Sequence, residues 1–96
     1  MDEFQVVQQK KREILAIIKQ HGLSNVRIFG SVARGDETPL SDVDFLVDLK
    51  KDCTIFDLGG AHVKLQVLLG RKVDIVTERS LHWYLRDKIL QEARPL

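Results

Sequence analysis

The residues with the clearest chemical potential are two aspartates on one predicted strand. Asp42 and Asp44 are two positions apart in a stretch that alternates between apolar and mostly acidic side chains. Residues i and i+2 of a strand project to the same side, about 6.6 Å apart, so these two carboxylates can lean toward a shared point. Two anions that meet require cations, and Mg²⁺ prefers hard oxygen ligands. Because paired ions are the usual arrangement for in-line displacement at phosphorus, the pair predicts phosphoryl or nucleotidyl transfer.

Two further features support a phosphate chemistry. Gly30 ends an apolar strand and allows a tight turn, and Ser31 would then direct N–H groups and a hydroxyl at an incoming phosphate. Asp74 lies in an apolar strand, where a buried acid would be costly. If that strand pairs beside the strand of Asp42 and Asp44, Asp74 would complete the metal cluster and could accept the proton of an attacking hydroxyl. The alternative, that these aspartates simply face solvent, stays open at this level.

The elements that would position these residues alternate between helical and strand periods, which predicts an α/β fold. The order of elements is expected to be α-β-(α)-β-α-β-α. One helix is predicted over residues 2–21, followed by Gly22 as its C-terminal glycine, and a short helix is expected near residues 32–34. Strands are predicted at residues 26–29, 42–49 and 73–77.

Two more helices are expected in the second half of the chain. Thr54 is predicted to cap one that ends at Gly70, and Ser80 is predicted to cap a last helix that ends before Pro95. The first of these should turn six apolar side chains inward: Ile55, Leu58, Ala61, Leu65, Leu68 and Leu69.

Composition limits the class of protein. A chain of 96 residues with 44% hydrophobic residues is expected to form one domain, residues 1–96, that folds unaided. Its net charge of +1 gives no strong nucleic-acid signal. A single cysteine, Cys53, cannot form an internal disulfide, and neither a signal peptide nor a membrane span is evident. A cytoplasmic protein is therefore expected.

The run Gly30-Ser31-Val32-Ala33-Arg34-Gly35, followed by Ser41-Asp42-Val43-Asp44-Phe45-Leu46-Val47, resembles the minimal nucleotidyltransferase family of the DNA polymerase beta superfamily. The stretches 69–76 and 89–93 are also similar to that family. The resemblance implies a small mixed β-sheet flanked by helices. It also implies Mg²⁺-dependent transfer of a nucleoside monophosphate from a nucleoside triphosphate, with two ions and release of pyrophosphate. Asp42, Asp44 and Asp74 match the family's catalytic, metal-binding acids, and Gly30 and Ser31 match its triphosphate-binding pair.

The resemblance further implies a partner protein. Minimal nucleotidyltransferases act as the antitoxin of a HEPN-domain toxin by adding AMP, taken from ATP, to a tyrosine of that toxin, and the two proteins can form a hetero-oligomer. A second interpretation is an antitoxin that neutralises by binding alone. A third is an adenylyltransferase that acts on a small molecule, which would leave a labelled product without any partner protein.

Other polar and aromatic residues carry weaker signals. The three histidines have no metal-ligand spacing and are interpreted as helix-surface residues. Asp48 lies about 13 Å of strand rise beyond Asp44 and is left out of the site. Arg34 could contact a phosphate or form a structural ion pair. Because Trp83 and Tyr84 are consecutive on the last helix, one of them is expected to stay partly exposed, either as a partner anchor or as a rim aromatic.

Overall fold

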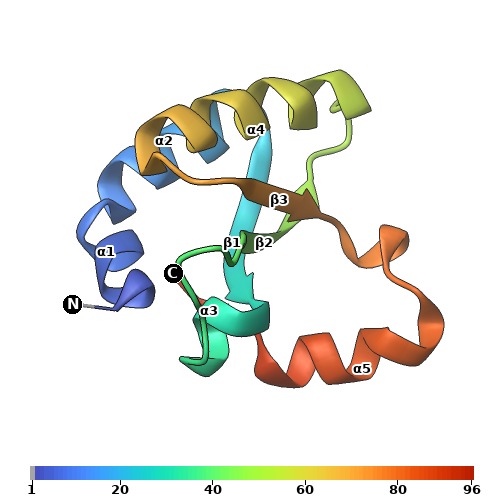
Figure 1. The fold of residues 1–96 in the computed structure, drawn as a ribbon. Coiled ribbons are helices and arrows are strands. Elements are labelled where there is room, and N and C mark those ends of the chain that lie inside the picture. The colour runs from blue at the N-terminus through green and yellow to red at the C-terminus, as the bar shows by residue number, and fades with distance from the viewer. Residues whose placement is uncertain (1) are drawn as a thin grey trace.

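The computed structural model describes residues 2–96, which form a four-stranded mixed sheet in the order β3-β2-β1-β4 (Figure 1). At its centre, β1 (Leu23–Phe29) runs antiparallel to β2 (Val43–Leu49) and to the short β4 (Arg94–Pro95). The outer strand β3 (Val73–Val76) runs parallel to β2. The mixed sheet confirms the predicted α/β class, and β4 is the strand that periodicity missed.

Helices cover both faces of this sheet. They are α1 (Glu3–Gln9), α2 (Lys11–Gln20), α3 (Gly30–Arg34), α4 (Ile55–Leu69), the 3₁₀ helix η1 (Glu78–Ser80) and α5 (Trp83–Glu92). Figure 1 shows α2 and α4 together on one side of the sheet, with α3 and α5 on the other. None of these helices in residues 2–96 combines the length and the apolar content that crossing a bilayer requires.

The core lies between the sheet and the α2–α4 layer. Alternation along β2 turns Val43, Phe45 and Val47 into this core, where all three are fully buried. They share one cluster with buried residues of the two helices, among them Ile14, Ile18, Ala61 and Leu65. Each fully buried Val, Ile, Leu or Phe side chain contributes about 1.5–3 kcal/mol. The opposite face of β2 is therefore free to carry Asp44 and Asp48.

The predicted helix over residues 2–21 is two helices, which meet at Lys10 with φ −98° and ψ 15°. A continuous helix would place Lys11 in the apolar stripe between Val7 and Ile14. The break leaves Lys11 exposed while Val7 and Ile14 are both fully buried. Lys10 Nζ also donates to the carbonyl of Leu68, 2.9 Å away, at the end of α4.

The prediction that Ile55 faces inward is wrong, because its side chain is 75% exposed, whereas Ala61, Leu65 and Leu69 are buried as expected. The 15 residues of α4 span about 22 Å, and the four of β3 about 13 Å, so the first turn of the helix extends past the strand. The outer face of α4 is also apolar: Phe56, Val63 and Val67 are exposed. Helix α4 is thus apolar on two sides, only one of which is covered in residues 2–96.

The predicted cap of the last helix is also wrong. Ser80 belongs to η1, where its Oγ donates to the carbonyl of Thr77 and accepts from the Thr77 amide. Helix α5 starts three residues later, after His82, which makes no side-chain capping bond. Both Trp83 and Tyr84 are exposed, at 84% and 62%, rather than one of the two.

Candidate active site

The pairing of β2 with β3 brings the predicted acids to one place. The strands are parallel, with Val43 opposite Val73 and Asp44 opposite Asp74. Side chains of directly opposed residues project to the same face of a sheet, so these two carboxylates are neighbours. Asp42 immediately precedes β2 and, two residues from Asp44, projects to the same side. The strand pairing on which the role of Asp74 depends is therefore present.

The ionisation of Asp44 is opposed first by its burial and then by its acidic neighbours. Burial of the carboxyl, followed by repulsion from Asp74 and then from Asp42, raises the pKa of Asp44 from 3.8 to about 6. Arg34 opposes this rise in pKa, and Glu92 adds to it. The ionised form of Asp44 is therefore disfavoured in this site, and a bound cation would stabilise it.

The turn at Gly30 is built around Asp44. Phe29, at the end of β1, lies opposite Asp44, and Gly30 follows with φ +74°. A Cβ atom at position 30 would collide with Oδ2 of Asp44. Both the positive φ and the close approach require glycine here. Ser31 follows in the first turn of α3, so the predicted phosphate-binding pair lies directly beside the acids.

Sequence reasoning missed Glu92, which binds this turn from the end of α5. Its Oε1 accepts the Gly30 amide at 3.0 Å, and both of its carboxylate oxygens lie 3.2 Å from Nη1 of Arg34. Arg34 also donates to Asp36 at 3.1 Å. Of the two roles that the sequence left open for Arg34, phosphate contact or ion pair, the structure shows the ion pair. Because Glu92 is 62 residues from Gly30, no local spacing could reveal the contact.

Arg71 is a second residue that spacing did not reveal. One of its nitrogens, Nη2, donates to the carbonyls of Thr38, Pro39 and Ser41, at 3.0, 3.2 and 2.9 Å. Its Nη1 pairs with Glu3 at 3.0 Å in a mostly buried ion pair. Arg71 therefore holds the loop that leads into Asp42 and fastens it to α1.

The donor set fits magnesium by its chemistry. Three carboxylates stand at one end of two paired strands, and Mg²⁺ binds through carboxylate oxygens. Within residues 2–96, however, no three Asp, Glu, His or Cys side chains are arranged closely enough to hold one ion together. Lys72 Nζ lies 3.9 Å from Asp42 Oδ2, an exposed and weak pair.

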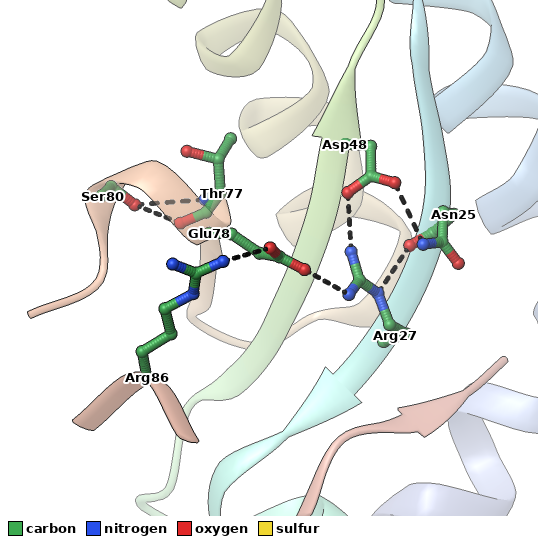
Figure 2. A network of polar contacts seen from close by, with 7 residues as sticks. All are labelled: Asn25, Arg27, Asp48, Thr77, Glu78, Ser80 and Arg86. Atoms are coloured by element: carbon green, nitrogen blue, oxygen red, sulfur yellow. Dashed lines mark hydrogen bonds and ion pairs between the residues drawn. The ribbon is translucent and has the colours of Figure 1, made fainter. Parts of the chain in front are cut away.

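Asp48 belongs to a separate polar network on the same strand (Figure 2). Its Oδ1 pairs with Arg27 at 2.8 Å and its Oδ2 accepts from Asn25 at 3.0 Å. Arg27 also pairs with Glu78 of η1 at 3.3 Å, and Glu78 with Arg86 of α5 at 3.2 Å. This network joins the sheet to η1 and α5, and its charges are already matched.

Comparison with known proteins shows the family to which this chain belongs. Residues 11–96 match the model of the nucleotidyltransferase domain. A candidate protein adenylyltransferase of Methanocaldococcus jannaschii, MJ0435, is 38% identical over 87 residues, covering 91% of this chain and 94% of the relative. The protein adenylyltransferase MntA of Thermococcus cleftensis is 32% identical over 75 residues, covering 78% of this chain and 76% of that protein.

Solved structures agree with the sequence matches. A candidate minimal nucleotidyltransferase superposes with a TM-score of 0.87 and 41% identity, covering 100% of this chain and 97% of that one. A toxin-antitoxin structure with AMP-PNP has a TM-score of 0.74 at 22% identity, covering 88% and 70% of the two chains. A complex of a tri-AMPylated Shewanella oneidensis HEPN toxin with an MNT antitoxin has a TM-score of 0.68 at 20% identity, covering 92% and 69%. At these lower identities the last two share the fold.

A sheet with neighbouring acidic strands beside a glycine–serine turn, together with these matches, defines a nucleotidyltransferase enzyme. The chain belongs to the nucleotidyltransferase domain family, among its minimal nucleotidyltransferases.

Proposed function

We propose that this protein transfers AMP from ATP, with magnesium, to a hydroxyl group of a HEPN-domain toxin, most simply a tyrosine, and thereby acts as its antitoxin. The observation that carries the proposal is the register that sets Asp44 beside Asp74, with the Gly30 turn against Asp44. Relatives named as protein adenylyltransferases support AMP as the group transferred and protein as the acceptor. The fold shared with toxin-antitoxin structures, one with AMP-PNP and one with an AMPylated HEPN toxin, supports the nucleotide and the partner.

Each residue has a distinct task in this reaction. Asp42, Asp44 and Asp74 would hold the magnesium ions, whose charge offsets that of the triphosphate and of the developing oxyanions. The turn at Gly30 and Ser31 would position the triphosphate. Asp74, the most exposed of the three acids, would accept the proton of the acceptor hydroxyl. The hydroxyl oxygen then bonds to the α-phosphorus. At the same time the bond between the α-phosphorus and the oxygen that bridges it to the β-phosphorus breaks, and pyrophosphate leaves with that electron pair.

The test follows label from α-labelled ATP to a HEPN-domain toxin, the proposed acceptor. Wild type should label the toxin, and the double variant Asp42→Asn/Asp44→Asn should lose at least about 1,000-fold in rate, because two charge-stabilising groups are removed. Asp48→Asn is the matched control. It removes a carboxylate from the same face of β2, but Asp48 pairs with Arg27 and lies outside the candidate site, so this variant should retain labelling.

Two results would contradict the proposal. If the double variant still neutralises the toxin and wild type transfers no label, neutralisation works by binding alone. If label appears in a small molecule without the toxin present, the acceptor is not a protein.

A further inference from the structure

A cavity lies against the outermost strand of the sheet, next to the third acid. It has a volume of about 440 Å³ and is bordered by the start of α4 and by β3 with the turn after it. Among its lining residues are Ile55, Leu58, Gly59, Asp74, Ile75 and Thr77. We call this cavity the edge groove. It joins the candidate site because Asp74 lines both.

The strand that forms the floor of the edge groove has an unpaired edge. At Val73, side chains of α4 satisfy the outward backbone groups: Gln66 accepts the amide at 3.2 Å, and His62 contacts the carbonyl. Backbone groups of alternate residues point to the same edge of a strand, so the amide and carbonyl of Ile75 point to this side as well. Within residues 2–96 neither has a hydrogen bond there. Free strand edges of this kind pair with extended peptide segments.

The wall of the edge groove is apolar and open. Leu58 is partly buried against the core, and Ile55 is 75% exposed. A side chain built on Gly59 would meet no atom within 4 Å, so the helix leaves room at this point. Apolar side chains of a partner segment can pack here.

We propose that the edge groove is the acceptor site: an extended segment of the partner protein pairs along β3 at Ile75 and presents its hydroxyl-bearing residue beside Asp74. Opposed residues on neighbouring strands project to the same face, so an acceptor residue in register with Asp74 stands in line with Asp74 and Asp44. Its two sequence neighbours project to the other face, toward Ile55 and Leu58. The fitting segment therefore has apolar residues on both sides of the modified hydroxyl residue.

This inference rests on the proposed function and adds the route of the acceptor to it. The acceptor hydroxyl gives its proton to the Asp74 carboxylate as its oxygen bonds to the α-phosphorus, and pyrophosphate leaves as described above. Because the triphosphate is assigned to the Gly30 turn on the far side of Asp44, nucleotide and acceptor enter from opposite sides of the acids.

Two substitutions block the edge groove without touching the acids. Gly59→Leu fills the open space on a helical position, and Ile55→Glu places a charge on the apolar wall. Val67→Glu is the matched control, because Val67 is 80% exposed on the same helix but does not line the groove. Both groove variants should lose at least about tenfold in kcat/KM for the toxin, mainly through KM, with the Kd for ATP unchanged within about twofold. The control should stay within about twofold of wild type.

Several outcomes overturn the proposal. Unchanged transfer in both groove variants excludes an acceptor role, and a similar loss in Val67→Glu assigns the contact to the outer face of α4 instead. A loss of ATP affinity that parallels the loss of transfer assigns the edge groove to the nucleotide.

Hydrogen exchange of the Ile75 amide in the complex of this protein with the HEPN toxin separates this inference from the proposed function. Protection of that amide on complex formation, even without transfer of label, supports docking while the proposed function fails. Transfer of label without protection, and without sensitivity to the groove variants, refutes the docking while the proposed function stands.

Discussion

Ionised Asp44 lowers the stability of the folded protein, because burial and two neighbouring carboxylates oppose its ionisation. Asn at this position removes the charge and keeps the shape, so Asp44→Asn should abolish transfer yet raise the free energy of unfolding. The gain expected at pH 8 in chelator-treated buffer is about 1–2 kcal/mol, since part of the carboxyl meets solvent. Urea denaturation of both proteins measures it.

The pH dependence of that gain has a definite sign. The pKa of Asp44 is raised from 3.8 to about 6 on folding, so the folded state binds the proton more tightly than the unfolded chain does. Wild type therefore loses stability as the pH rises from about 4 to about 6, and the advantage of Asp44→Asn should vanish below about pH 4. An advantage that persists at low pH would mean that the variant acts through packing and not through charge.

Gly30 offers a residue-scale test of the turn against Asp44. Gly30→Ala combines positive φ with a collision at Asp44, and it should cost more than about 2 kcal/mol and lower transfer by about 100-fold. Gly35→Ala is the control: φ is +80° there, and a Cβ would meet no atom within 4 Å. It should cost about 1 kcal/mol from backbone strain alone. Thermal unfolding and label transfer are measured for both; equal losses would show that the collision with Asp44 has no effect.

At the scale of elements, Arg71 links α1 to the loop before β2. Arg71→Gln removes a mostly buried ion pair with Glu3 and three contacts to loop carbonyls. It should cost about 2–3 kcal/mol and lower transfer, because Asp42 loses the support of its preceding loop. Amides of residues 36–42 should then exchange faster. Arg86→Gln, in an exposed pair with Glu78, should change the stability by less than about 0.5 kcal/mol.

At the scale of the whole molecule, residue 94 joins three distant parts of the chain. Arg94 pairs in β4 with Ile28, its guanidinium lies 3.7 Å from the centre of the Phe4 ring, and it donates to the carbonyl of Ala33 at 3.4 Å. Arg94→Ala should cost about 1 kcal/mol in urea denaturation. Arg94→Lys keeps a cation near the ring and should lose less; an equal loss would assign the effect to the planar guanidinium.

Local chemistry explains which parts of the fold could be predicted from the sequence. Alternation in residues 42–49 predicted both the buried and the acidic face of β2, because side-chain direction in a strand depends only on parity. Gly70 was predicted as the end of α4 and adopts φ +64° there, a conformation that suits glycine. The break at Lys10 and the exposed start of α4 could not be predicted in this way, because they depend on what lies opposite each turn of helix.

The sequence alone determined the type and spacing of the groups at the candidate site: the aspartates at 42, 44 and 74 and the glycine–serine turn at 30 and 31. The tertiary structure decided that β3 lies parallel to β2 in the register that opposes Asp44 to Asp74. It also decided that Glu92 binds the Gly30 turn and that the far edge of β3 stays open beside Asp74. The physical reason is the sequence distance over which each property is set. Side-chain direction within a strand depends on neighbouring residues, whereas strand order and long-range contacts follow from the burial of the whole core.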